Sequence, residues 1–329
     1  MTVNLHAISL DNNEFEGENN AYLLESRGEL ALVDTGFQRP SIRDELVGGL
    51  AELGYEPGDL DRVVLTHHHF DHSGLAGELT NDHGTPVSVH AADAPLVERD
   101  PATIERWESL HTGRFEEWRM PETKRDELLA FFEAAPPVEP PTTIEPLEDG
   151  DVIEVGRWKL RTRHTPGHSA GHCCFAFDHD GDREVFVGDA ILPVYTPNVG
   201  GADLRVERPL EQYLETLAAI ESASYDRAWP GHRGAIEDPA ERAATIAEHH
   251  HERTENVLDV LESAGPSTVW EVSDALFGEL ESIHILHGPG EAYAHLDHLE
   301  RAGAVERVDG RYRLSDGPVD VAEILSPSS

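Results

Sequence analysis

Short apolar runs that end in tight, glycine-containing turns recur through the first 240 residues. Such runs, bounded by Gly and Pro, are typical of buried strands. A His or Asp stands at the tip of each turn, and these tips are found at Asp34, residues 66–72, His168, Asp189 and His232. The pattern predicts a first domain over residues 1–240 in which strand ends carry polar side chains.

The pattern changes near residue 240, and a second domain over residues 241–329 is expected. Apolar residues at spacings of three, four and seven over residues 239–261 predict a long helix. Residues 268–271 have the Thr-x-x-Glu pattern of a capping box, which starts a short helix, and another helix is expected over 292–302. Two alternating runs joined by Asp309-Gly310 predict a hairpin. Two helices followed by a hairpin are the order of a winged helix.

Residues 66–72 read Thr-His-His-His-Phe-Asp-His and directly follow an apolar run. Imidazole nitrogens and carboxylate oxygens are ligands that Zn²⁺ accepts at about 2.0–2.2 Å. In an extended segment His67, His69 and Asp71 lie on one side. His72 points elsewhere and can serve a second ion. The segment therefore predicts a metal site.

This segment and four further turns resemble, in order, the five motifs of the metallo-β-lactamase superfamily. Those motifs are an Asp after a strand, His-x-His-x-Asp-His, Gly-His, Gly-Asp and a final Gly-His, and their joint match is specific. The resemblance covers roughly residues 1–240 and implies an α/β fold, a four-layer αββα sandwich with a metal cleft at one edge. The four turns are Val33-Asp34-Thr35-Gly36, Thr165-Pro166-Gly167-His168, Val187-Gly188-Asp189-Ala190 and Trp229-Pro230-Gly231-His232.

The resemblance also implies a role for each matching residue. Asp34 would orient the metal-binding loop through hydrogen bonds, and His68 occupies a variable position and is left out of the ligand set. Two ions about 3.5–4 Å apart can share a hydroxide as nucleophile, and Asp71 is the candidate for handling its proton. Zinc is the default metal, with manganese and iron as alternatives. The implied ligands are His67, His69 and His168 for one ion, Asp71, His72 and His232 for the other, and Asp189 as the bridge.

An insertion over residues 101–135 has large aromatic residues at helical spacing. Two or three helices are expected there, lying over the mouth of the metal cleft. Trp107 or Trp118 would then form an apolar wall for the substrate. Burial of these aromatics in a core is the alternative.

The loop over residues 192–203 starts three residues after the expected bridging Asp189 and should border the site. Tyr195 and Asn198 are its candidate donors to a developing oxyanion. A tight surface loop without a role in binding is the alternative.

The chain is strongly acidic, with 64 Asp and Glu against 25 Lys and Arg and a formal net charge of −39. Only Lys124 and Lys159 are lysines. The acidic excess runs along the whole chain and resembles that of proteins from organisms with molar internal salt, where a screening length of about 3 Å at 1 M removes self-repulsion. An acidic interaction surface in an ordinary cytosol is the alternative.

The two cysteines, Cys173 and Cys174, lie in an apolar run and are expected to be small core residues. The first ten residues lack the basic start and apolar stretch of a signal peptide. No stretch approaches eighteen apolar residues, so no membrane partner is expected. These features favour a cytoplasmic protein, with a homodimer as one option.

Three functions remain open. The leading one is a dinuclear-metal hydrolase that acts on a small ester or thioester, or on RNA. A second is a single-stranded RNA endonuclease, because residues 292–305 resemble the winged-helix domain of the β-lactamase-like protein 2 family, whose members cut single-stranded RNA. The third is a metal-stabilised interaction protein without activity.

The charge of the second domain bears on the nuclease alternative. Residues 239–329 hold eighteen acidic and six basic residues, a net charge of −12. A nucleic-acid module ordinarily presents a basic face to phosphates. A local basic patch remains an option, since four arginines cluster on or beside the hairpin: Arg301, Arg307, Arg311 and Arg313.

Overall fold

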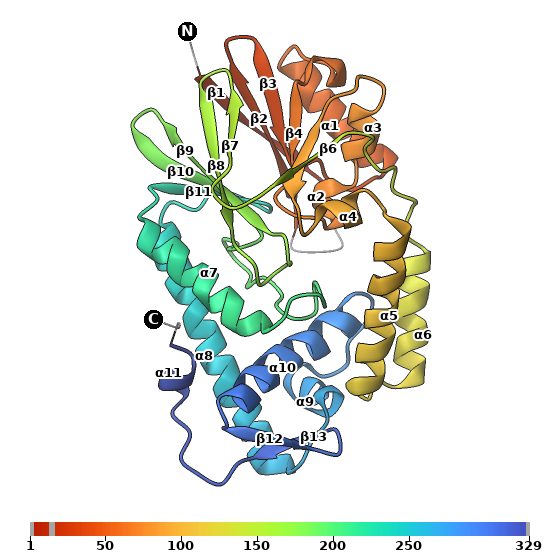
Figure 1. Ribbon diagram of the computed structural model, residues 1–329, viewed down its shortest axis with the longest axis vertical. Helices are drawn as coiled ribbons and strands as arrows, with labels where there is room; N and C mark the ends of the chain where they lie inside the picture. The colour runs from red at the N-terminus through yellow and green to blue at the C-terminus, as the bar shows by residue number, and fades with distance from the viewer. Residues whose placement is uncertain (1–2, 13–16, 327–329) are drawn as a thin grey trace.

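Two β-sheets face each other in the upper half of the molecule in a computed structural model that describes residues 3–12 and 17–326 (Figure 1). Helices cover the outer faces of both sheets, and a helical C-terminal part lies below them. Separate apolar cores fill the space between the sheets and under the helices on each side. The expected four-layer α/β sandwich is therefore found.

The first sheet has six strands in the order β1-β2-β3-β4-β5-β6. The first three strands pair antiparallel and the last four pair parallel, which makes the sheet mixed. Its strands are β1 (Val3–Leu10), β2 (Asn19–Ser26), β3 (Glu29–Val33), β4 (Arg62–Val64), β5 (Val87–His90) and β6 (Ile144–Leu147). Its helices are α1 (Pro40–Glu52), α2 (Phe70–Ser73), α3 (Ala76–Thr80) and α4 (Ala94–Val97), with a 3-10 turn at Pro57–Asp59.

The second sheet has five strands in the order β11-β10-β9-β8-β7. In β8, Trp158, Leu160 and Thr162 are buried and alternate with exposed basic residues, as expected for a strand with one face on the core. Cys173 and Cys174 are buried, as predicted. The strands are β7 (Val152–Val155), β8 (Trp158–His164), β9 (Cys173–His179), β10 (Asp182–Gly188) and β11 (Arg227–Pro230), and α7 (Pro209–Ala223) precedes β11.

The C-terminal part has the predicted order of two helices and a hairpin. The long helix α8 (Pro239–Ala264) leads to α9 (Val269–Phe277), which starts with the expected capping box. Helix α10 (His284–Arg301) begins well before the predicted residue 292, because Pro289 and its flanking glycines hide the helical pattern. The hairpin consists of β12 (Val305–Val308) and β13 (Arg311–Leu314), and α11 (Val321–Ile324) follows. No helix of the described ranges is long and apolar enough to cross a bilayer.

The insertion forms two helices, α5 (Pro101–Glu117) and α6 (Glu122–Glu133), which pack against the C-terminal part (Figure 1). Trp118 is 0% exposed, its ring lies 5.7 Å from that of Tyr293, and its carbonyl accepts a hydrogen bond from the backbone of Trp270. The prediction that Trp118 lines a substrate cleft is therefore wrong. The half-buried ring of Trp107 contacts that of His111, with the ring centres 3.7 Å apart and the ring planes tilted by 37°.

Candidate metal centre

The seven predicted ligands converge where the strands of both sheets end. The segment after β4 carries the first two histidines, and α2 carries Asp71 and His72. The turns after β8, β10 and β11 supply the rest: His168, Asp189 and His232. Residues more than 160 positions apart in the chain are thus brought to one point, in groups that could hold metal ions.

The first group consists of three histidine nitrogens that face one another. Nδ1 of His69 lies 2.9 Å from Nε2 of His67 and 3.0 Å from Nε2 of His168. Burial lowers the pKa of each of these three histidines, which keeps the imidazoles neutral. Three neutral imidazoles with converging nitrogens suit a divalent cation.

The second group surrounds the carboxylates of Asp71 and Asp189. Nε2 of His232 lies 3.4 Å from an oxygen of each carboxylate, and Nε2 of His72 lies 3.5 Å and 3.6 Å from Asp189 and Asp71. Within the described residues, Nε2 of His72, Nε2 of His232 and Oδ1 of Asp189 are buried without a hydrogen-bond partner. Unpaired buried polar atoms are costly, and a cation between these atoms would satisfy them.

The charge of the second group also favours a cation. Although burial lowers it, the pKa of His232 is raised to about 10 by Asp189 and Asp71, and that of His72 is raised by the same carboxylates. The carboxylates thus favour positive charge at this point, which a divalent ion supplies. The pKa of Asp189 is held well below its usual range by His232 and His72, against the effect of burial.

Asp189 faces both groups. Its Oδ2 lies 3.4 Å from Nε2 of His232 in the second group and 3.7 Å from Nε2 of His168 in the first. The turn beside it requires Gly231, because a Cβ there would lie 2.4 Å from Oδ1 of Asp189 and 2.5 Å from His72. This geometry fits the expected bridging position.

Backbone carbonyls orient three of the histidines. Nε2 of His69 donates to the carbonyl of Ala202 at 3.0 Å, and Nδ1 of His168 donates to that of Asn198 at 3.0 Å. Nδ1 of His232 donates to the carbonyl of Gly17 at 3.1 Å. Because the proton is fixed on these nitrogens, the other ring nitrogen of each histidine keeps its lone pair and can coordinate a metal.

Asp34 lies behind the centre, as the resemblance implied. Its Oδ2 accepts hydrogen bonds from Nδ1 of His72 at 2.9 Å and from the hydroxyl of Thr66 at 2.8 Å. Its Oδ1 accepts from the backbone N–H of Thr66 at 2.8 Å. Asp34 therefore joins the segment of the first two histidines to α2.

His172 belongs to the site and was missed in the sequence. Its Nε2 accepts a hydrogen bond from the backbone N–H of Asp189 at 3.1 Å, and its Nδ1 lies 2.9 Å from the hydroxyl of Thr165. Burial lowers its pKa to about 3, so the ring stays neutral and can accept. The only signal was its place four residues after His168, in the same turn.

A third cluster, made of His68, Asp93 and Asp203, could also hold a cation. An internal cation is already there, because the guanidinium of Arg205 lies 2.6 Å from a carboxylate oxygen of each aspartate. The aspartates also accept hydrogen bonds from the backbone of residues 170 and 171, beside His168. We therefore interpret this cluster as a support for the ligand-bearing turns, which agrees with leaving His68 out of the ligand set.

The two candidate donors of the 192–203 loop differ. The carboxamide of Asn198 is engaged by the protein, since its Nδ2 donates to the carbonyl of His287 and its Oδ1 accepts from the backbone of Gly201. One N–H of the carboxamide is thus used within the protein, and the role of Asn198 as a donor to an oxyanion stays a prediction. Tyr195 is 48% exposed, and the guanidinium of Arg233 lies 4.9 Å from its ring centre.

The comparisons with known proteins agree with this geometry. The sequence model of the metallo-beta-lactamase superfamily matches residues 15–232 of the chain. The chain therefore belongs to this superfamily, and we conclude that it is an enzyme. A metallo-beta-lactamase family protein from Thermus thermophilus has a similar structure, with 33% identity, a TM-score of 0.80, and coverage of 94% of this chain and 98% of that chain.

Two curated relatives differ in what their names say. The chain is 24% identical to an atrochrysone carboxyl ACP thioesterase of Aspergillus fumigatus, over 79% of this chain and 69% of the relative. It is 23% identical to the beta-lactamase-like protein 2 homolog of Drosophila melanogaster, over 94% of this chain and 89% of the relative.

Proposed function

We propose that the protein is a dinuclear-metal hydrolase that cleaves a small ester or thioester. The observation that carries this proposal is the position of Asp189, whose carboxylate faces the three-histidine group and the second group at once. Bound there, two divalent ions, with zinc as the default, would supply an activated water and polarise the carbonyl under attack. The donor set of imidazoles and carboxylates suits such ions.

Asp71 is the residue proposed to move the proton. Its Oδ2 accepts a hydrogen bond from Nδ2 of Asn19 at 3.3 Å and lies 3.4 Å from Nε2 of His232. Burial raises the pKa of Asp71, but His72 and His232 outweigh it and hold the pKa below its usual range. The carboxylate therefore stays ionised at neutral pH, which suits a metal ligand; the proposed role as proton acceptor rests on its place beside the expected bridging water and not on its pKa.

Exposed apolar side chains next to the ligands support a small, partly apolar substrate. Phe70, between the ligands His69 and Asp71, is 42% exposed. Val194 and Tyr195, in the loop after Asp189, are 59% and 48% exposed. Exposed apolar groups beside a polar centre are typical of sites for small molecules. The thioesterase name of the fungal relative supports the same substrate class.

The second candidate is a single-stranded RNA endonuclease, and the similarity to the beta-lactamase-like protein 2 homolog favours it, because that match covers 94% of this chain. The proposed winged helix would then bind RNA. The arginines that would hold phosphates in this case are paired with carboxylates at 2.6–2.8 Å: Arg301 with Asp297, Arg307 with Glu117, Arg311 with Glu271 and Arg313 with Glu306.

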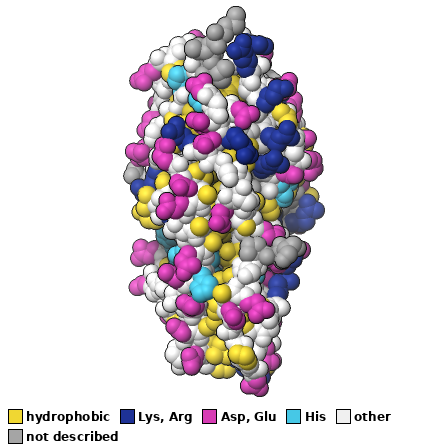
Figure 2. Space-filling view, turned by 90° about the vertical axis from the view of Figure 1, so that its left-hand side faces the viewer, with side chains coloured by type: hydrophobic (Ala, Val, Ile, Leu, Met, Phe, Trp, Pro, Cys, Tyr) yellow, Lys and Arg dark blue, Asp and Glu magenta, His cyan; other side chains and the backbone are white. Residues whose placement is uncertain are grey.

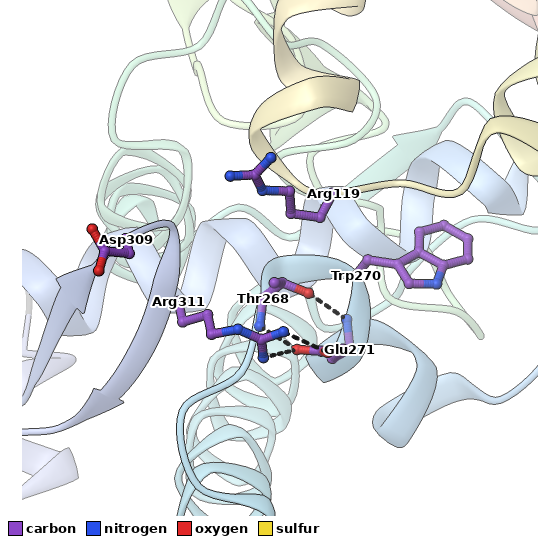
Figure 3. Close-up of a pocket in the computed structure, with 6 residues that line it drawn as sticks. All are labelled: Arg119, Thr268, Trp270, Glu271, Asp309 and Arg311. Carbon is purple, nitrogen blue, oxygen red and sulfur yellow. Dashed lines mark hydrogen bonds and ion pairs between the residues drawn. The ribbon is translucent and has the colours of Figure 1, made fainter.

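The surroundings of the hairpin show how one of these arginines is held. A surface pocket of about 430 Å³ lies between the hairpin and the start of α9. In it, both terminal nitrogens of Arg311 contact the carboxylate of Glu271, at 2.6 Å and 3.1 Å (Figure 3).

On the face shown in Figure 2, Lys and Arg side chains gather mainly in the upper, sheet-bearing half, while acidic side chains are spread over all of it. These features favour the small substrate.

The test is a side-by-side assay at molar KCl with Zn²⁺ or Mn²⁺, using acyl thioesters, aryl esters and labelled single-stranded RNA. We expect turnover of an ester or thioester, and a loss on the order of 10²–10⁴-fold in Asp71→Asn, which keeps the shape but removes the proton acceptor. RNA cleavage without ester turnover would favour the nuclease. Turnover of none of these would contradict both proposed substrate classes.

A triple change of Arg307, Arg311 and Arg313 to Gln separates the two candidates further. Because these arginines are paired within the protein, we expect the change to alter stability or association and to leave ester turnover intact. Weaker RNA binding, with a log–log salt slope reduced by about 0.7 for each lost phosphate contact, would instead support the nuclease.

A further inference from the structure

Helix α10 of the C-terminal part contacts the loop after Asp189 through backbone atoms, at glycines that have no side chain to separate the two segments. A Cβ on Gly290 would lie 2.1 Å from Cα of Gly201, and one on Gly201 would lie 2.7 Å from Cα of His287. A Cβ on Gly200 would lie 2.5 Å from the carbonyl oxygen of Gly290. No other residue type fits at these three positions without moving the helix or the loop.

The same loop holds the first histidine group. The side chain of Asn198 donates to the carbonyl of His287 at 3.0 Å, and its Oδ1 accepts from Gly201 at 3.1 Å. The backbone carbonyls of Asn198 and Ala202 accept from the rings of His168 and His69. The loop therefore has α10 on one side and two candidate ligands on the other.

His287 lies in the first turn of α10, close to the metal centre. Its ring is half-buried, and its backbone carbonyl accepts a hydrogen bond from the side chain of Asn198, whose own backbone carbonyl accepts from the ring of the candidate ligand His168. The neighbouring Ile285 and Leu286 are buried in the C-terminal core, which fixes the helix. Burial lowers the pKa of His287 to about 3, so at neutral pH the ring is an uncharged hydrogen-bonding group.

We propose that α10 forms one wall of the active site, with His287 as a substrate-contacting residue and Asn198 as a positioning residue. His287 would donate a hydrogen bond from its neutral imidazole to an oxygen of the bound acyl substrate. The identity of that ligand rests on the proposed function. The role of α10 in holding the loop does not, because it concerns how His69 and His168 are oriented.

The first experiment tests the contact between helix and loop without using turnover. Gly290→Ala should push α10 away from Gly201, and zinc should then be stripped at a chelator concentration about tenfold lower or more, since the partners that orient ligands contribute 10–100-fold to metal affinity. Gly113→Ala is the matched control, because an added Cβ on this helical glycine would meet no described atom within 4 Å apart from its chain neighbours and the backbone of its own helix.

Asn198→Asp is the second variant, in case Gly290→Ala fails to fold. It keeps the acceptor for Gly201 and removes the donor to His287, so zinc retention should fall in the same direction. Wild-type zinc retention in either folded variant would overturn the inference about the loop. Failure of the wild type to bind zinc would instead count against the proposed function.

The second experiment tests the contact with substrate. For an N-acetylcysteamine thioester, and for its non-hydrolysable ketone analogue, we expect KM and Kd to rise on the order of tenfold in His287→Ala, with unchanged zinc content. His287→Gln, which keeps a donor, should restore part of the affinity, and His251→Ala on α8 should resemble wild type. If the wild type is active and His287→Ala leaves KM and Kd unchanged, the substrate-contacting role of His287 is overturned. The role of α10 in holding the loop is not affected by that result.

Discussion

Asp34 accepts a hydrogen bond from Nδ1 of His72 at 2.9 Å, from a backbone conformation with a φ of 58°. Aspartate and asparagine adopt this left-handed conformation more readily than most residues. The bond keeps a proton on Nδ1 of His72 and leaves its Nε2 facing the carboxylates of Asp71 and Asp189. One hydrogen bond thus determines which nitrogen of His72 is presented to a metal.

Asp34→Asn tests this relationship. Asparagine keeps the backbone conformation, but one of the two accepting oxygens becomes an NH₂ group, which cannot accept a hydrogen bond. In one orientation of the amide this group faces the N–H of Thr66, and in the other it faces the hydroxyl of Thr66 and Nδ1 of His72. We expect the affinity for the second ion to fall by about 10–100-fold while the far-UV circular dichroism stays the same. Asp44→Asn, at an exposed helix position, is the control. Equal metal affinity in Asp34→Asn and wild type would contradict the orienting role.

The candidate ligands could be predicted from the sequence because each lies in a short local motif. His67, His69 and Asp71 share one segment, and the turns with His168 and His232 carry the glycine that such turns need. Their supports could not be predicted in the same way. The carbonyl of Ala202 is a backbone group that any residue could supply, and no pattern in the sequence marks it as the partner of His69.

The insertion shows a different limit. Helical spacing correctly predicted that residues 101–135 form helices with an apolar face. Spacing alone does not say which surface that face meets, and Trp118 meets the C-terminal part. Likewise, the loop with Asn198 was expected to border the site, but its partner in α10 lies 89 residues further along the chain.

Stability should rise with salt. The net charge of −39 places many like charges on one surface, and screening removes their repulsion as the Debye length falls to about 3 Å at 1 M. We expect the melting temperature to increase steadily from low KCl to molar KCl. A melting temperature that stays flat or falls over this range would refute adaptation to molar salt.

Stability should fall on acidification when it is measured at molar KCl, where charge repulsion is screened. Burial lowers the pKa of His250 to about 4 and that of His295 well below its ordinary value, so the unfolded chain binds more protons than the folded one below about pH 6.5. Each histidine should therefore remove up to about 1.4 kcal/mol of unfolding free energy per pH unit between about pH 6.5 and 4. His295→Gln should show a shallower slope in denaturant titrations, and an unchanged slope would contradict this account.

The metal content of the chain tests the central claim most directly. Elemental analysis of protein purified without chelator, scaled to protein concentration by amino-acid analysis, should give two divalent ions per chain. In Asp189→Asn, which weakens the group that faces both sites, the ratio should fall. A wild-type ratio that stays at or below one after incubation with Zn²⁺ or Mn²⁺ would contradict the dinuclear centre.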